Sequence, residues 1–245
     1  MPEIAMGSMT VHAYEAWGVV TGVLYALLMY PVARRAGIGA RDFWVIGVVT
    51  CAALYLGSRV FFEALEFGHM PGRMWVDPHP IWLRIWEPVG FTFLGGAAAL
   101  FPAHLALGLS RAVKPGPGRI LDVLAPVTAF AFAASKVGCL LAGCCGAADP
   151  RVPLQVIEMA IAIALGVAAL AAIFRAPASW RLRDGTVYAA WMLASSVARF
   201  ATGFARGGYE VRLGPLHAVQ WGAAAIAIAS VAALAWLVAS RREKA

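Results

Sequence analysis

The run ILDVLAPVTAFAFAASKVGCLLAGCC, residues 120–145, decides the fold. Asp122 and Lys136 are its only charged residues, and Asp122 lies near its start, where a role at a helix end explains it. A helix needs about 20 predominantly apolar residues to cross the roughly 30 Å hydrocarbon core of a bilayer. A membrane strand would instead alternate apolar and polar residues. The run therefore predicts a membrane-spanning helix.

Six further runs of the same kind accompany it, separated by loops rich in glycine, proline and arginine. Only 13% of the 245 residues are charged, against about 25% in soluble domains, and the mean hydropathy is +0.74. We expect an all-α, polytopic membrane protein with about seven transmembrane helices in a single domain over residues 1–245. The first run lacks a preceding basic region and a cleavage site, so we expect a retained helix. The six runs are residues 11–32, 43–66, 88–110, 153–174, 185–205 and 214–239.

Basic residues are unequally shared between the two sets of loops that these helices connect. The set that includes the C-terminus holds twelve lysines and arginines, and the other set holds five. Cytoplasmic loops carry the excess of basic residues in membrane proteins. The sequence thus predicts an external N-terminus and a cytoplasmic C-terminus. The twelve are Arg34, Arg35, Arg41, Arg111, Lys114, Arg119, Arg175, Arg181, Arg183, Arg241, Arg242 and Lys244.

The net charge of +7 has the same explanation. The basic residues fall in short clusters between apolar runs, and no predicted helix has a basic face with interleaved aromatic residues. We therefore expect a membrane-embedded protein with no nucleic-acid partner.

Three charged residues, Lys136, Glu158 and Arg199, lie inside predicted helices with no oppositely charged residue one turn away. A charge at the centre of a membrane helix costs about 2.5–3.5 kcal/mol on insertion scales. Such residues usually pair with one another or line a cavity. We therefore expect partners from other helices and a functional role for all three. Arg59 and Glu63 differ, because a spacing of four residues lets them neutralise each other on one helix face.

Arg199 and Arg206 are seven residues apart in ARFATGFARGG, with Gly203 between them. On one helix this spacing is about two turns, so both guanidiniums would share a face with room beside the glycine. Two guanidiniums can hold a phosphate by forked hydrogen bonds. The alternative is a glycine that packs against a neighbouring helix, with Arg206 reaching the membrane surface.

Three cysteines, Cys139, Cys144 and Cys145, lie at the predicted external end of residues 120–145. Their spacing is neither CxxC nor that of a structural zinc site, so the signal for a metal site is weak. Three interpretations stay open: an oxidised pair, thiolates bridged by a soft cation, and inert small residues. Cys51, in the second run, is expected to be a buried small hydrophobe.

The order of these features resembles that of the bacterial prolipoprotein diacylglyceryl transferases, seven-helix inner-membrane enzymes with the same topology. VHAYEAWGVVTG looks like the family's first-helix motif, and LGSRVFFEAL is similar to its Gly-Ala-Arg stretch, with Arg59 as the arginine. DVLAPVTAFAFAASKVGCLLAGCCG is similar to the Asp-x-x-Ala-Pro lead into the family signature. VPLQVIEM matches a Pro-x-Gln-x-x-Glu segment, and DGTVYAAWMLASSVARFATGFARGG resembles the sixth helix. The likeness covers nearly the whole chain.

Several family positions hold other residues in this chain. IWEPVGFTFLGGAAAL looks like a segment that normally reads Ser-Phe-His-Gly-Gly, and Leu94 stands at the histidine. Lys136 stands for the signature arginine, which keeps the charge and loses the forked geometry. The Gly-Cys-Cys sequence matches a divergent branch of the family. Cys139 and Ala142 replace the signature asparagines, Cys144 its glutamate, and Gly203 the glutamate of the sixth helix.

The resemblance implies an activity, a substrate and partners. A diacylglyceryl group would pass from phosphatidylglycerol, an anionic phospholipid, to the cysteine thiol of a prolipoprotein in the bacterial inner membrane, without a cofactor. The implied phosphate-binding residues are Arg59, Lys136, Gln155, Arg199 and Arg206. Glu158, His12 and Tyr14 are the candidate catalytic residues, with Glu158 or His12 as the base that Leu94 cannot be.

Two other classes of protein remain open. In the first, a homologue that binds anionic lipid keeps the phosphate site and has lost catalysis, which the changed motif positions favour. In the second, Cys139, Cys144 and Cys145 carry thiol redox or soft-metal chemistry at the outer face. A solute transporter is disfavoured because the seven runs show no internal repeat.

Overall fold

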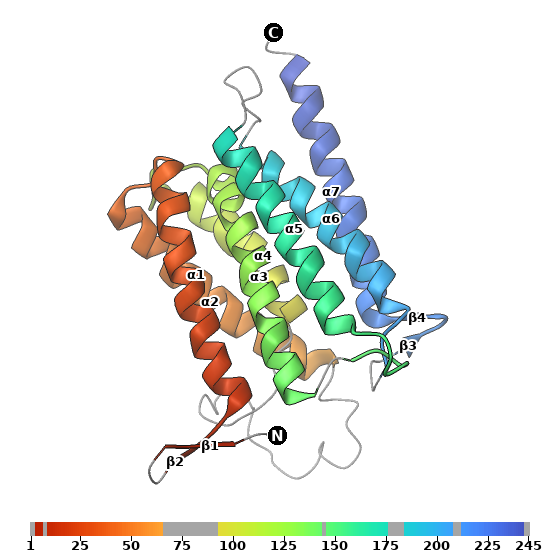
Figure 1. Ribbon diagram of the computed structural model, residues 1–245. Coiled ribbons are helices and arrows are strands. Elements are labelled where there is room, and N and C mark those ends of the chain that lie inside the picture. The colour runs from red at the N-terminus through yellow and green to blue at the C-terminus, as the bar shows by residue number, and fades with distance from the viewer. Residues whose placement is uncertain are drawn as a thin grey trace.

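A computed structural model of the chain describes residues 3–6, 9–65, 93–143, 146–175, 184–207 and 212–242. Within these ranges the chain forms seven helices and two short antiparallel hairpins (Figure 1). The hairpins pair β1 (Glu3–Met6) with β2 (Met9–His12), and β3 (Arg212–Leu213) with β4 (Leu216–His217). The helices are α1 (Ala13–Arg35), α2 (Ala40–Leu65), α3 (Phe93–Leu109), α4 (Pro117–Ala142), α5 (Leu154–Arg175), α6 (Thr186–Gly203) and α7 (Ala218–Arg242). Each helix overlaps one predicted run.

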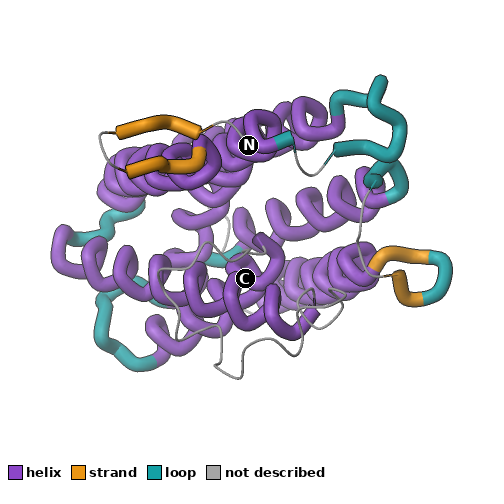
Figure 2. Tube along the Cα trace, turned by 90° about the horizontal axis from the view of Figure 1, so that it is seen from below, coloured by secondary structure: helices purple, strands orange, loops and turns teal. Residues whose placement is uncertain are grey.

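Helix α4 is the centre of the bundle, because it contacts α1, α3, α5 and α6 (Figure 1). Figure 2 shows the bundle of helices from below. Leu124 on one side of α4 is fully buried in a cluster with Met29 of α1 and Ile46 of α2. Ala125, the next residue, belongs to a second cluster with Trp191 of α6. A helix that is buried on opposite sides must be apolar nearly all round. This explains why residues 120–145 form such an uninterrupted apolar run.

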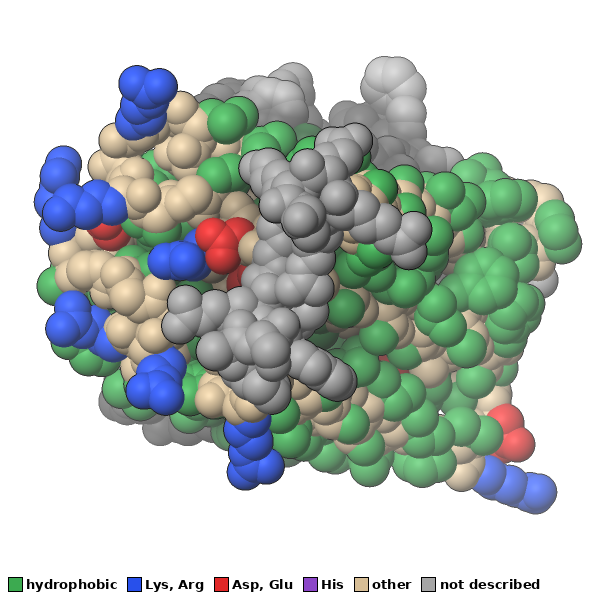
Figure 3. Space-filling model, turned by 90° about the horizontal axis from the view of Figure 1, so that it is seen from above, with side chains coloured by type: hydrophobic (Ala, Val, Ile, Leu, Met, Phe, Trp, Pro, Cys, Tyr) green, Lys and Arg blue, Asp and Glu red, His purple; other side chains and the backbone are tan. Residues whose placement is uncertain are grey.

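The outside of the bundle is also apolar. Leu27, Ile228 and Trp236 are 65%, 71% and 61% exposed, and hydrophobic side chains cover much of the flank visible in Figure 3. Monomeric soluble proteins rarely expose such extended apolar surface. Among the described helices, α2, α4, α5 and α7 are long and apolar enough to cross a membrane, and α3 holds a shorter apolar stretch. The chain is an α-helical membrane protein, as its composition predicts.

Successive helices run in opposite directions, so the two termini lie at opposite ends of the bundle (Figure 1). We call these the N-terminal end and the C-terminal end. The ends of α1, α3 and α5 and the starts of α2, α4 and α6 lie at the C-terminal end (Figure 1). Basic side chains gather at this end in Figure 3. The described and exposed ones at or next to these helix ends are Arg34, Arg35, Arg41, Arg111, Lys114, Arg119 and Arg175.

Asp122 ties α4 to the start of α6. Its carboxylate accepts hydrogen bonds from the backbone N–H groups of Gly185, at 2.8 Å, and Tyr188, at 2.9 Å. The first N–H groups of a helix have no partner inside that helix, so a side-chain oxygen from a neighbouring helix can satisfy them. Asp122 thus has a structural role at a helix start, but the helix is α6 and not its own helix α4. This link fixes how α6 lies along α4.

Two details differ from the sequence-based expectations. His12 ends strand β2, and α1 begins one residue later at Ala13. Cys51 is exposed on the surface of α2, so the expectation that it is buried is wrong. A membrane helix is apolar toward lipid as well as toward its neighbours, so composition alone does not show which way Cys51 faces.

Candidate functional site

The end of α4, the start of α5 and the end of α6 meet at the N-terminal end of the bundle. The segment after α4 pairs with the segment after α6 through an antiparallel bridge between Ala147 and Arg206. The N–H of Ala148 donates to the Ala205 carbonyl at 2.9 Å, and that of Gly207 donates to the Gly146 carbonyl at 3.2 Å. A Cβ at position 207 would lie 2.7 Å from the Cα of Ala148, so only glycine fits there. This pairing holds Arg206 over the start of α5.

Glu158, in the second turn of α5, is the meeting point of three basic side chains. The Lys136 ammonium of α4 lies 2.5 Å from Glu158 Oε2, and Nη1 of Arg199 on α6 lies 2.9 Å from Oε1. Nη2 of Arg206 donates to both carboxylate oxygens, at 2.8 Å and 2.9 Å. Lys136, Glu158 and Arg199 thus find their partners on other helices, which confirms that prediction. We call these four residues the Glu158 cluster.

Two uncharged side chains complete the surroundings of the cluster. The Thr202 hydroxyl donates to Glu158 Oε1 at 3.2 Å. The Lys136 ammonium lies 4.8 Å from the ring centroid of Phe132, one turn away on α4, within the range of a cation–π interaction. Both oxygens of Glu158 therefore accept from cationic donors, and its geometry is fixed from several directions.

The cluster is largely buried and combines three basic side chains with one acidic side chain. The side chains of Lys136, Glu158 and Arg206 are 5%, 4% and 6% exposed, whereas that of Arg199 is 26% exposed. Burying charge is unfavourable unless the charge is paired, and Lys136, Arg199 and Arg206 are all paired with Glu158. Arg199 is the member that a ligand can reach most easily.

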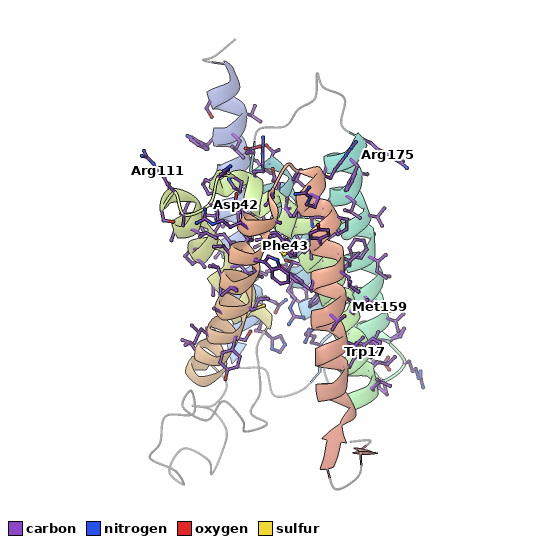
Figure 4. The ribbon with its side chains drawn as sticks, turned by 90° about the vertical axis from the view of Figure 1, so that its left-hand side faces the viewer. Trp17, Asp42, Phe43, Arg111, Met159 and Arg175 are labelled. Atoms are coloured by element: carbon purple, nitrogen blue, oxygen red, sulfur yellow. The ribbon has the colours of Figure 1, made fainter. Side chains whose placement is uncertain are left out.

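The cluster lies near the N-terminal end of the bundle and not at its middle. Glu158 is four residues, about 6 Å, from the first residue of α5. In Figure 4, the neighbouring Met159 lies in the half of the bundle that holds Trp17 of α1. Arg111 and Arg175 lie at the opposite end. A ligand of the cluster would therefore enter from the N-terminal end or sideways from that half of the membrane.

Arg206 does not share a helix with Arg199, so the expectation of one helix face with two arginines is wrong. Helix α6 ends at Gly203, and the chain then turns toward the bridge with Ala147. The space beside Gly203 is filled by Gln220 of α7, which is 1% exposed. The packing interpretation therefore describes Gly203, but Arg206 is buried and does not reach the surface.

Of the remaining candidate residues, the structure describes the side chains of Gln155 and Cys139. Gln155 lies one turn before Glu158, and its Nε2 atom would be 3.6 Å from a Cβ at Gly146. Cys139 is buried on α4, one turn beyond Lys136. The side chains of His12, Tyr14 and Arg59, and the whole of Cys144 and Cys145, lie outside the described residues. Within the described residues, no three histidine, cysteine or acidic side chains are grouped to hold a metal ion.

Sequence reasoning did not single out Thr202 or Gln220. Thr202 lies three residues after Arg199, so the helical period was the signal that could have associated it with the cluster. Gln220 had a weaker signal, as a polar residue near the start of the apolar run 214–239. Its role depends on how α6 and α7 pack, which the sequence does not specify.

These features define a helical membrane protein with a buried site in which three basic side chains surround one carboxylate. A comparison with family models identifies it further: residues 3–236 match the model described as prolipoprotein diacylglyceryl transferase, and the chain belongs to that family. No curated protein matches the sequence. Membership indicates a multi-pass membrane transferase of the prolipoprotein diacylglyceryl transferase type, which acts in lipoprotein biosynthesis with a phospholipid donor and a lipoprotein acceptor.

Proposed function

We propose that this chain transfers a diacylglyceryl group from phosphatidylglycerol to the cysteine thiol of a prolipoprotein. The observation that carries the proposal is the Glu158 cluster, in which Lys136, Arg199 and Arg206 converge on one buried carboxylate. The three cations bind the phosphate of the lipid. Gln155 and Arg59 are further phosphate ligands by their positions in the family motifs.

The charge of the cluster suits the product better than the substrate. Phosphatidylglycerol carries one negative charge on its phosphodiester. The departing glycerol phosphate is a monoester, with a charge of about −1.5 to −2 at neutral pH. Three basic side chains at the phosphate therefore stabilise the transition state, in which the second negative charge develops, more than the bound substrate. The cluster lowers the barrier by favouring departure of the phosphate.

The reaction needs a thiolate and a fixed leaving group. The thiolate sulfur attacks the glycerol carbon that bears the phosphate, so a C–S bond forms while the C–O bond breaks and its electron pair leaves with the phosphate oxygen. The thiol proton passes to a base. Because both oxygens of Glu158 accept from Lys136, Arg199 and Arg206, we assign Glu158 the positioning of these cations and His12 the role of the base. We assign Tyr14 the role of orienting the substrate, as its position in the family motif implies.

We also propose that seven helices span the inner membrane of a bacterium, with the N-terminal end outside. The support is the excess of basic residues at the C-terminal end, which marks the cytoplasmic side. The Glu158 cluster would then lie in the outer half of the membrane. A secreted prolipoprotein would present its cysteine on that side.

Mass spectrometry of an acceptor peptide tests the proposal. Purified protein is mixed with phosphatidylglycerol and a lipobox peptide, and the peptide should gain the mass of a diacylglyceryl group. Arg199→Ala should abolish the gain, whereas Arg119→Ala, at the exposed Asp184 ion pair of the C-terminal end, should leave it unchanged. Protein that binds the lipid with no mass gain would overturn the transferase proposal and favour the lipid-binding homologue. Loss of a mass gain with Cys139→Ser but not with Arg199→Ala would favour thiol chemistry.

A further inference from the structure

An apolar groove lies between α1, α4 and α5, away from the Glu158 cluster. It encloses about 200 Å³ and is lined only by apolar side chains, among them Leu28, Val127, Phe130, Leu170 and Phe174. Pockets for drug-sized molecules measure roughly 300–1,000 Å³ and include some polar groups. The groove is smaller and has no polar group, so its volume and lining fit a segment of a hydrocarbon chain.

The groove belongs to the half of the bundle near the C-terminal end. Leu170 lies twelve residues after Glu158 on α5, which corresponds to about 18 Å along the helix. Phe174 is 41% exposed, and Pro31 of α1, which also lines the groove, is exposed as well. The groove therefore opens sideways, toward the space that lipid occupies around a membrane helix.

Arg35 stands at the mouth of this groove, and Arg175 is adjacent in sequence to the lining residue Phe174. The guanidinium carbon of Arg35, at the end of α1, lies 5.9 Å from the ring centroid of Phe174, so it spans from α1 to α5. Arg175 follows Phe174 at the end of α5 and lies at the C-terminal end in Figure 4. Both arginines are exposed. An apolar groove with two guanidiniums nearby offers a place for the acyl chain and a place for the phosphate of an anionic phospholipid.

We propose that this groove binds one phospholipid with an anionic headgroup, taken from the leaflet at the C-terminal end. Its phosphate lies between Arg35 and Arg175, and one acyl chain runs past Phe174 into the groove toward Phe130. Basic pockets between membrane helices commonly hold anionic headgroups in this way. The site is distinct from the Glu158 cluster, and lipid binding here does not depend on the transfer reaction.

The acyl chain in the groove could belong to a substrate lipid at the Glu158 cluster or to a lipid of the leaflet at the C-terminal end. The basic residues near the groove distinguish these two sources. The chain of a substrate lipid bound at the Glu158 cluster would enter from the other half of the membrane and would not contact Arg35 or Arg175. A lipid of the leaflet at the C-terminal end places its phosphate beside these arginines. The arginines therefore favour this leaflet as the source.

Photo-crosslinking at Phe174 tests the site directly. Phe174→p-benzoylphenylalanine puts a photoreactive ring at the groove mouth, and the variant is reconstituted in vesicles that contain labelled phosphatidylglycerol or labelled phosphatidylcholine. We expect strong labelling by the anionic lipid and weak labelling by the zwitterionic one. Adding Arg35→Gln and Arg175→Gln should lower the labelling by more than about tenfold, since each basic residue contributes about fivefold in affinity. Adding Leu28→Trp, which fills the groove, should lower it as well.

Two control variants distinguish this site from diffuse surface charge and from binding of the substrate's acyl chain. Arg111→Gln removes an exposed arginine at the same end but on the opposite flank of the view in Figure 4, and labelling should not change. Arg199→Ala, in the Glu158 cluster, should also leave it unchanged. An equal loss of labelling with Arg111→Gln would show that diffuse surface charge attracts the lipid. A loss of labelling with Arg199→Ala, but not with the Arg35 and Arg175 substitutions, would show that the groove holds the acyl chain of the substrate. Equal labelling by both lipids would exclude headgroup recognition.

Discussion

Gln220 of α7 occupies the space that a side chain at Gly203 of α6 would need. A Cβ at position 203 would lie 2.5 Å from Gln220 Cγ and 2.8 Å from its Cδ. Gln220 is held in place from both sides, since its Oε1 accepts from the His217 N–H at 3.0 Å and its Nε2 donates to the Phe200 carbonyl at 3.1 Å. This contact fixes α7 against the end of α6, from which the chain continues to Arg206.

Gly203→Ala should therefore destabilise the protein, although alanine favours a helix more than glycine does. The added methyl group meets a buried side chain that cannot move without breaking two hydrogen bonds, and overpacking of this kind costs about 1–3 kcal/mol. Thermal unfolding in detergent measures the loss. In the Gly203→Ala/Gln220→Ala double variant the losses should be less than additive, because the contact is already gone. Additive losses would show that the two residues do not compete for space.

The helices could be predicted from the sequence because their signal is local. Residues 120–145 are apolar nearly throughout, and the seven predicted runs correspond to the seven helices of the described chain. The hairpins β1–β2 and β3–β4 were not predicted, since their strands are only two to four residues long and lie at or just before the starts of apolar runs. The exposed position of Cys51 was also missed, because lipid and protein interior select the same residues.

The site could be predicted in part. Lys136, Glu158 and Arg199 stand out because charges in apolar helices need partners. Their common meeting point depends on the packing of α4, α5 and α6, and on the bridge between Ala147 and Arg206. These are contacts between segments far apart in the sequence. No spacing rule indicated that α6 ends at Gly203, and the sequence left open whether the space beside this glycine is filled.

Asp122→Ala should weaken the connection between α4 and α6. The substitution leaves the N–H groups of Gly185 and Tyr188 without their acceptor inside the protein, at a cost of about 1–3 kcal/mol. Asp122→Asn keeps one carbonyl acceptor and should lose less stability. Unfolding in detergent distinguishes the two variants. If both were as stable as the parent protein, the cap would have no energetic role.

Glu158→Ala should destabilise the protein more than any change at an exposed ion pair. Removing the carboxylate leaves three cations near one another in a buried site, and breaking a buried pair in this way costs about 3–5 kcal/mol. Asp184→Ala is the matched control, since Asp184 lies 3.5 Å from Arg119 with both side chains about half exposed. Such exposed pairs contribute about 0–1 kcal/mol. Comparable losses of stability in the two variants would contradict a buried, charge-dense cluster.

Added anion should reverse part of the Glu158→Ala defect. Phosphate or glycerol phosphate can take the place of the missing carboxylate among Lys136, Arg199 and Arg206, and a ligand that binds only the folded state raises its stability. We expect the melting temperature of Glu158→Ala to rise with phosphate concentration more steeply than that of Asp184→Ala. Sodium chloride at equal ionic strength controls for screening. Equal slopes for the two variants would show that the cluster does not bind phosphate.

Two substitutions of Lys136 test separately whether the reaction needs its charge and whether the site needs its shape. Lys136→Met removes a cation from the leaving-group site, and we expect transfer to the lipobox peptide to fall by about 10²–10³-fold, as when one transition-state donor is lost. Lys136→Arg keeps the charge and supplies the family's usual residue, but its larger head must fit a position that is 5% exposed and 2.5 Å from Glu158. We expect it to retain most of the activity and to lose about 1–3 kcal/mol of stability through overpacking. The mass gain of the peptide and unfolding in detergent measure the two effects independently. Equal activity of Lys136→Met and the parent protein would remove Lys136 from the reaction, whatever its part in the fold.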